Sequence, residues 1–469
     1  MNELSRRWVR KDSGSSGDGL WPVTWQTTAH GVGTGRYTDP AFARLEHEKL
    51  WRKVWQAAAR LDEIPEPGDY TVYDIGDESV LLVRVDSSQV KAYHNVCPHR
   101  GTALGQGAGS FENCRILCPF HGWRWNLSGQ IEFVLERQEF CNGQLRDADV
   151  ALREVKVAVF AGFVFINLNR EPEPFEDFIA PVRRIIEDLA IGEMHHRWWK
   201  ALPVPANWKV AQEAFFEAFH VPATHPQLEK GGAQVIQGKR EAAEFTHRYV
   251  TYETFPHGHG RFYGGQKTPM AGHVNELEGD LLTQMAARLQ LLVDGLDAMV
   301  LEEDVDILLS LRGKPIPQGS SLGAEYARAL YARAAAEQRP MPRRAPEVLG
   351  MWGGEVFIFP NLMILPQAGN AMMYRVRPQG LDPERCTFEI FSTRTLPAEV
   401  KPSRATLQQV TDLLDPEQVR LIPRQDIGNI PRIQKGLHSS GIQQVWLAAN
   451  QEKIISNMHH ELDRYLRAE

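Results

Sequence analysis

The 469-residue sequence has no run of about 18 or more apolar residues, so no segment is long enough to cross a bilayer as a helix. Its first residues are polar and charged where a secretory signal would need an apolar stretch. These absences predict a cytoplasmic protein that does not enter a membrane. The five cysteines are too few for a disulfide framework, which favours a reducing compartment and metal-binding or core roles.

The sequence also lacks an excess of positive charge, because its formal net charge is -7 at pH 7. This charge argues against nucleic acid as a partner. No flavin or nicotinamide fingerprint is present. The hydrophobic fraction of 43% allows a large buried core, and single cores rarely extend beyond about 250–300 residues. Two domains are therefore predicted.

Three segments are distinguished by composition. Residues 1–40 form a polar N-terminal extension with a glycine- and serine-rich part, to which no function is assigned. Asp39-Pro40 then offers a helix cap and a first-turn proline, and short β-rich runs separated by turn residues follow. Residues 41–175 are thus predicted to be a helix followed by an antiparallel β domain. The pattern then becomes helical, and residues 176–469 are assigned to a larger second domain.

The strongest motif lies inside the predicted β domain and pairs Cys97 with His99 and Cys118 with His121. Two thiolates and two imidazoles are the ligands of a [2Fe–2S] centre in which histidines replace two cysteines on one iron. Such a centre has a raised reduction potential and accepts electrons from a low-potential donor. A structural zinc site uses the same ligand types but usually pairs Cys with Cys and His with His. The mixed pairs therefore favour the iron–sulfur cluster.

The other cysteines, Cys114, Cys141 and Cys386, have no partner at ligand spacing and are predicted to be small buried apolar residues. His257 and His259 have metal-ligand spacing, but their glycine- and proline-rich surroundings predict an exposed loop. A second metal site is not expected there.

A further group of ionisable residues lies between residues 207 and 225 and contains Glu213, Glu217, His220 and His225. Their spacing predicts that both acids share a helix face with His220. Two buried histidines on one element can be ordinary core residues. The redox motif upstream favours a metal site instead, because two histidines and one carboxylate with open positions are the ligands of non-haem Fe(II) oxygenases.

The predicted helix cannot continue undisturbed through Pro222, since the preceding residue is biased away from helical backbone. A bend there can bring His225 to the same ion as His220. The third ligand has to come from elsewhere, and the residues alone leave four candidates near the C-terminus: Asp412, Asp415, Glu417 and Asp426.

Three motifs together resemble the catalytic α subunits of Rieske non-haem iron oxygenases, also called ring-hydroxylating oxygenases. They are Cys97 to Gly101, Cys118 to Trp123 and Gln425 to Leu437, and the resemblance extends from about residue 40 to 465. It implies an α+β fold, in which an N-terminal antiparallel β Rieske domain precedes a larger catalytic domain with an antiparallel sheet flanked by helices. The family's acid eight residues before a Gln-x-Gly motif binds iron, which implies this role for Asp426.

The resemblance also implies a homotrimer, in which the cluster of one subunit passes electrons to the mononuclear iron of its neighbour. An acid three residues before the first iron histidine bridges the two centres by hydrogen bonds, and Glu217 occupies that position here. Most of the family has aspartate there, whereas glutamate occurs in some branches, including those acting on quaternary amines. Glu213 is a second candidate for the bridging role. The alternative interpretation of Glu213 is an ordinary solvated or salt-bridged acid on a helix.

The implied function is that of an oxygenase component. Electrons from NAD(P)H arrive through a separate reductase, directly or through a ferredoxin, and O₂ is activated at Fe(II) to hydroxylate an aromatic or other largely apolar substrate. The alternative is a monooxygenase or demethylase acting on a non-aromatic or quaternary amine. An electron-transfer protein with an inert scaffold is disfavoured because all three predicted iron ligands are present. The resemblance allows both a homotrimer and an α3β3 complex with a small β subunit.

The second domain is predicted to enclose a mostly apolar substrate cavity. Helices over residues 277–311 and 324–336 are expected to form a lid or entrance, and strands near residues 356–391 are expected to form walls. The candidate pocket residues are aromatic: Phe215, Phe216, Phe262, Trp352 and Phe359.

Overall fold

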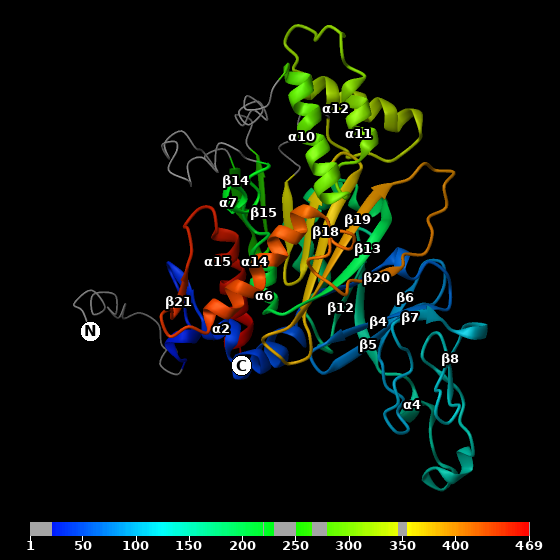
Figure 1. The fold of residues 1–469 in the computed structure, drawn as a ribbon. Coiled ribbons are helices and arrows are strands. Elements are labelled where there is room, and N and C mark those ends of the chain that lie inside the picture. Colours follow the sequence, from blue (N-terminus) through cyan, green and yellow to red (C-terminus); the bar gives the residue numbers. More distant parts are fainter. Residues whose placement is uncertain (1–20, 219, 229–249, 265–278, 346–353, 469) are drawn as a thin grey trace.

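Two large antiparallel sheets, one in each half of the chain, organise the computed structural model (Figure 1). The structure describes residues 21–218, 220–228, 250–264, 279–345 and 354–468. The predicted α+β class is confirmed, since an antiparallel N-terminal domain precedes a larger domain that combines a sheet with helices.

The N-terminal half contains a seven-stranded sheet built from the short β-rich runs. Apolar side chains fill its centre, where Val80, Leu81, Leu82 and Val83 are fully buried. Across the sheet the strands are β3 (Gln56–Arg60), β12 (Phe163–Asn167), β11 (Glu154–Phe160), β6 (Val90–His94), β5 (Glu78–Arg84), β4 (Asp69–Ile75) and β7 (Ala108–Ser110).

A smaller three-stranded sheet extends from this domain and carries part of the cysteine–histidine motif (Figure 1). The motif's first loop connects β6 to β7, and its second loop connects β8 to β9. The two loops therefore belong to different sheets that share one hydrophobic core. The strands of the smaller sheet are β10 (Ile131–Phe133), β9 (Arg124–Asn126) and β8 (Arg115–Leu117).

The second half is built on an eight-stranded sheet whose central strands are almost wholly buried. All neighbouring strands in it are antiparallel except β13 and β20. In spatial order they are β14 (Val250–Thr254), β15 (Gly260–Gly264), β16 (Glu355–Ile358), β17 (Leu362–Pro366), β18 (Asn370–Pro378), β19 (Cys386–Thr395), β13 (Met194–Val204) and β20 (Leu407–Gln409).

Helices cover this sheet and extend beyond one end of it (Figure 1). The predicted helical run over residues 277–311 is two helices, because Asp297 ends the first with a left-handed φ of 48°. With a third helix they bury an apolar core of their own. None of the helices within the described ranges is long and apolar enough to cross a bilayer. The main helices are α5 (Phe175–Asp188), α10 (Leu281–Leu296), α11 (Glu302–Leu309), α12 (Leu322–Ala336), α14 (Leu421–Leu437) and α15 (Lys453–Arg467).

Part of the N-terminal extension is built into the fold. Strand β2 (Gly31–Gly33) pairs with β1 (Thr27–Thr28) and with β21 (Gln444–Trp446) near the C-terminus. A Cβ atom on Gly31 would lie 2.1 Å from the carbonyl oxygen of Val445, so the close pairing requires glycine. The segment is thus less independent than its polar composition suggests, while the domain boundaries themselves stay predictions.

Buried polar contacts join the two large sheets. The side-chain amide of Asn361 accepts from the backbone N–H of Ala57 at 3.0 Å and donates to its carbonyl at 3.1 Å. Arg375 on β18 donates to Glu389 at 2.5 Å and lies 3.6 Å from Glu63 of the N-terminal domain. Because an unpaired buried charge is costly, these pairs fix how the two sheets meet.

The predicted burial of the three remaining cysteines is only partly correct. Cys386 is buried on β19, but Cys114 and Cys141 are exposed. Both exposed residues have positive φ values, 54° and 53°, in short turns at the surface of the smaller sheet's domain. Turn geometry places them there, which a hydrophobicity argument does not anticipate.

Candidate metal centres

The histidine stretch forms two short helices where the spacing predicts one. Helix α6 (Trp208–Glu213) ends at Glu213, and α7 (Val221–Thr224) begins directly after His220. Pro222 lies in the first turn of α7, where a missing backbone N–H costs nothing, so it starts a helix and does not bend one. The predicted shared helix face is therefore wrong.

Glu217 holds His220 by side-chain contacts. One carboxylate oxygen accepts from the backbone N–H of His220 at 2.8 Å, and the other lies 2.8 Å from its Nδ1. Because the carboxylate only accepts, Nδ1 carries the proton and Nε2 is left as a free donor atom for a metal. Burial opposes protonation of this ring, but the hydrogen bond to Glu217 and the charges of Glu217 and Asp426 outweigh it and raise the pKa of His220.

His225 is oriented in the same manner by a residue that the sequence did not indicate. Its Nδ1 lies 2.9 Å from Oε1 of Gln425, which also accepts from the side chain of Gln227 at 2.7 Å. The Nε2 atom of His225 then faces Asp426 at 2.9 Å. Gln425 opens the C-terminal motif beside Asp426, and that position was the only signal for its role.

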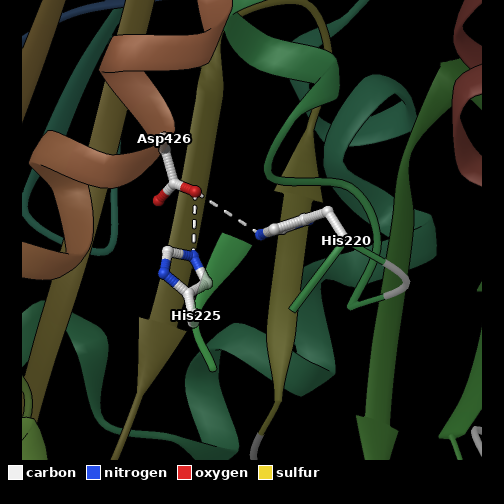
Figure 2. Close-up of side chains that lie close together, drawn as sticks. All are labelled: His220, His225 and Asp426. Atoms are coloured by element: carbon white, nitrogen blue, oxygen red, sulfur yellow. Dashed lines mark ion pairs between the residues drawn. The ribbon is translucent and has the colours of Figure 1, made fainter. Parts of the chain in front are cut away.

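Asp426 on α14 meets both histidines (Figure 2). Its Oδ1 atom lies 2.9 Å from Nε2 of His225 and 3.5 Å from Nε2 of His220. One ligand atom from each residue falls within 4.8 Å of the other two. Two neutral imidazoles and one carboxylate, with both Nδ1 atoms held by oxygen acceptors, fit a divalent iron ion with open positions.

The other candidate acids do not reach this group. Asp412 and Glu417 are exposed, and Asp412 and Asp415 accept from nearby backbone N–H groups of their own loop. The C-terminal motif instead fixes α14 against α6, since Gln434 accepts from the backbone N–H of Asn207 at 3.0 Å. The structure therefore brings Asp426 alone of the four candidates to the histidines.

Glu213 points away from the histidines into a buried cluster. Its carboxyl accepts from the hydroxyl of Tyr37 at 3.1 Å and lies 2.8 Å from Nε2 of His459. Burial raises the pKa of Glu213 to about 8 and lowers the pKa of His459. Of the two alternatives for Glu213, a solvated acid is wrong, whereas a salt-bridged acid agrees with its pairing with His459. Its contacts are with the N- and C-terminal helices.

This cluster predicts a pH-dependent contribution to stability. With a folded pKa of about 8 against an ordinary 4.5, Glu213 binds its proton more tightly in the folded protein. Its contribution is fully present below pH 4.5 and is lost as pH rises through about 8. The urea midpoint of the wild type should therefore fall more steeply between these limits than that of Glu213→Gln, which cannot titrate. Parallel pH profiles would contradict the burial of an ionisable group here.

The two cysteine–histidine loops have matching backbones. In each, a glycine four residues after the cysteine donates its N–H to the cysteine carbonyl, Gly101 to Cys97 at 2.9 Å and Gly122 to Cys118 at 3.1 Å. Both glycines have left-handed φ values, 81° and 71°. Because side chains disfavour that conformation, glycine at both positions makes the two turns alike.

The four side chains of these loops converge. The rings of His99 and His121 lie 4.5 Å apart, and both cysteines are 2% exposed. Trp123 stacks on His99 with centroids 4.8 Å apart. The Nδ1 atom of His99 is buried without a hydrogen-bond partner in the described chain, a costly arrangement unless a metal binds it. The donor set therefore fits an iron–sulfur cluster held by two thiolates and two imidazoles.

His259 is a core residue and not part of an exposed loop. Its ring is fully buried, and its two nitrogens lie 2.8 Å from the carbonyl of Phe178 and 3.0 Å from the N–H of Phe359. Burial lowers the pKa of His259 to about 3. Of the predicted pocket residues, Phe359 packs on Tyr465, and Trp352 lies outside the described residues.

Two family profiles match this chain. The one described as a Rieske [2Fe-2S] domain matches residues 54–142, and the one described as the ring hydroxylating alpha subunit (catalytic domain) matches residues 191–285 and 316–468. The second match alone covers more than half of the chain. The chain therefore belongs to the Rieske-type ring-hydroxylating oxygenase α subunits.

Curated relatives are named for quaternary amines. The chain is 33% identical over 195 residues to the carnitine monooxygenase oxygenase subunit of Escherichia coli, covering 40% of this chain and 50% of that one. It is 29% identical over 199 residues to the glycine betaine monooxygenase oxygenase subunit of Pseudomonas aeruginosa (41% and 44%), and 31% over 206 residues to the choline monooxygenase of Spinacia oleracea (42% and 45%). The match spans about half the length of these relatives.

Solved structures share the whole fold. A quaternary ammonium Rieske monooxygenase in complex with L-carnitine superposes with a TM-score of 0.61 at 18% identity, covering 93% of this chain and 96% of that one. Naphthalene 1,2-dioxygenase from Rhodococcus sp. gives 0.60 at 17% identity, with 94% and 95% covered. Because both substrate classes occur on this fold, the fold does not choose between them.

Proposed function

We propose that this chain is the oxygenase component of a Rieske-type monooxygenase acting on a quaternary amine. The observation that supports an oxygenase is the convergence of His220, His225 and Asp426, with both histidine Nε2 atoms turned toward the carboxylate. The names of the curated relatives favour the amine substrate over the aromatic hydrocarbon expected from the sequence. Glutamate in place of aspartate at residue 217 agrees with that choice.

Two metal centres are part of the proposal. When bound, the [2Fe–2S] cluster and the mononuclear Fe(II) supply electron transfer and O₂ activation. The proposed cluster ligands are Cys97, His99, Cys118 and His121, and the proposed iron ligands are His220, His225 and Asp426.

The protein's own contribution at the iron site is orientation. Glu217 and Gln425 each accept from one Nδ1–H, which fixes both imidazole rings with Nε2 toward Asp426. The ligands leave positions open for O₂ and water beside the substrate. We call the segment between α6 and α7, which contains Glu217 and His220, the iron loop. Its Phe215 packs on Tyr374 and its Phe216 packs on Phe357, with ring centroids 4.5 and 4.2 Å apart, so this loop covers an apolar face of the sheet.

The proposed partners are a separate reductase, with or without a ferredoxin, and other copies of this chain in a homotrimer. Within one chain, the smaller sheet with its β8–β9 loop lies far from the α7 region (Figure 1). Phe120 beside His121 is 57% exposed, which gives the cluster loops an apolar surface for a neighbouring subunit. Whether a β subunit joins, and the cytoplasmic location, stay predictions.

The proposal is tested with the iron-loaded oxygenase, a reductase and NADH under labelled O₂. Choline, glycine betaine and carnitine are compared with naphthalene, and oxygenated products are trapped by borohydride reduction before they exchange with water. We expect oxygen consumption with at least one quaternary amine and one labelled oxygen atom per product. A doubly labelled diol from naphthalene, with no consumption on any amine, would reverse the proposal in favour of the aromatic interpretation.

A further inference from the structure

Glu355, the first residue of β16, lies on the sheet face that the iron loop covers. Side chains two residues apart on a strand point to the same face. Phe357, two residues later, packs on Phe216 of the loop after α6, with ring centroids 4.2 Å apart. Tyr374, which reaches the same face through the register of β17, packs on Phe215 of that loop. Glu355 therefore faces the iron loop and not the opposite side of the sheet.

Two aromatic residues continue a row from Glu355 across the sheet. Glu355 pairs directly with Phe262 on β15, and Phe262 pairs with Tyr252 on β14. Directly paired residues share a face, and the rings of Tyr252 and Phe262 lie 5.4 Å apart. The Tyr252 hydroxyl accepts from the backbone N–H of Ala218, the residue after Glu217, at 3.2 Å. The row thus ends at the iron loop.

Among the residues that the structure describes, no cation offsets the burial of the Glu355 carboxyl. It is 5% exposed, and its Oε1 has no hydrogen-bond partner within the described part of the chain. Burial, together with the negative charges of Glu217 and Asp426, raises the pKa of Glu355 well above its usual range, whereas a cation bound beside the carboxyl would lower that pKa and favour the carboxylate. A buried carboxyl without partners is destabilising, so a strand position that an apolar residue would fill better needs another reason for an acid.

The neighbouring acids are already engaged. Asp426 faces the two histidine Nε2 atoms, and both oxygens of Glu217 accept from His220. Glu452, whose charge also raises the pKa of Tyr252, accepts from the backbone N–H of Ala448 at 2.6 Å. Among these acids, Glu355 is the one with a buried oxygen that has no hydrogen-bond partner in the described ranges. A quaternary ammonium group carries a full positive charge but no N–H donor, so it is recognised by charge and by aromatic faces and not by hydrogen bonds. A carboxyl without hydrogen-bond donors, in line with two rings, matches that chemistry.

We propose that Glu355, with Tyr252 and Phe262, binds the positively charged ammonium group of the substrate. This rests on the proposed function, because it names how a quaternary amine is recognised at the same iron site. The row holds the cationic head against the sheet face, opposite the loop that carries His220.

The test compares a cation with its neutral carbon isostere. Binding of choline and of 3,3-dimethylbutan-1-ol to the iron-loaded oxygenase is measured by isothermal titration calorimetry, and the same is done with glycine betaine and 3,3-dimethylbutanoate. In at least one pair the wild type should prefer the cation by about tenfold or more, an expected effect of charge and cation–π recognition. In Glu355→Gln that preference should fall at least several-fold, since the substitution keeps the shape and removes the charge, while the rings of Tyr252 and Phe262 retain the remaining preference.

Glu253→Gln is the matched control, because Glu253 neighbours Tyr252 on β14 but pairs with Arg261 at 2.5 Å. It should keep the wild-type preference, and iron content and cluster absorption should match in all three proteins. An unchanged preference in Glu355→Gln, an equal loss for cation and isostere, or no cation binding by the wild type would overturn the inference. If the wild type consumes oxygen on a quaternary amine and Glu355→Gln keeps the wild-type binding preference for the cation, only this inference fails. If the preference depends on Glu355 but no amine supports oxygen consumption, the proposed function fails instead.

Discussion

Asp426→Ala is expected to release the mononuclear iron and to lower substrate-dependent oxygen consumption by more than about 100-fold, the upper end of losses seen when only the partners of metal ligands are changed. Asp426 is the single anionic member of the group, and its Oδ1 is the atom that both histidine Nε2 atoms face. Two neutral imidazoles alone hold a divalent ion weakly, so the site should empty on dialysis.

The measurement is the iron content of the purified protein, which should fall from about three to about two atoms per chain when one mononuclear ion is lost beside an intact [2Fe–2S] cluster. The visible absorption of the cluster should be unchanged, because its loops belong to the other domain. Glu417→Gln serves as the control, since Glu417 is an exposed acid a few residues earlier. Full iron content in Asp426→Ala, or equal losses in the control, would remove Asp426 from the ligand set.

The sequence predicts the geometry of the iron–sulfur loops better than the geometry of the mononuclear iron site. The cysteine–histidine loops are local motifs, and each turn is set by a glycine four residues after its cysteine, so the chemistry can be predicted before the fold is known. The iron loop is different. Its path depends on Glu217, whose side chain satisfies the N–H of His220 and competes with a continuous helix.

Other features depend on contacts that sequence spacing does not contain. Gln425 orients His225 across about 200 residues of sequence, and Glu213 is buried by Tyr37 and His459 from the two ends of the chain. The burial of Glu355 follows from the register of β14, β15 and β16. An acid in an apolar strand is visible in the sequence, but which face it occupies and what surrounds it is not.

Glu217→Gln is the second substitution with a large expected effect. The carboxylate offers two acceptor oxygens, and His220 presents two donors to them, its backbone N–H and its Nδ1–H. Glutamine has one acceptor oxygen and one amide donor, so one of the two donors of His220 would face another donor. The iron ligands themselves are untouched. Both metal centres should therefore stay bound while coupled turnover falls by about 100-fold, as expected when a metal ligand loses its orienting partner.

Product formed per NADH oxidised, iron content and cluster absorption together test this expectation. Glu217→Asp is the informative comparison, because aspartate keeps two acceptor oxygens and differs only in reach. If the hydrogen bonds to His220 carry the effect, Glu217→Asp should retain more activity than Glu217→Gln, and the exposed Glu193→Gln should match the wild type. Normal coupled turnover in Glu217→Gln would reject both the orienting role and the proposed bridge to a neighbouring cluster. Loss of iron in that variant would instead show that the two hydrogen bonds are needed to hold the metal at all.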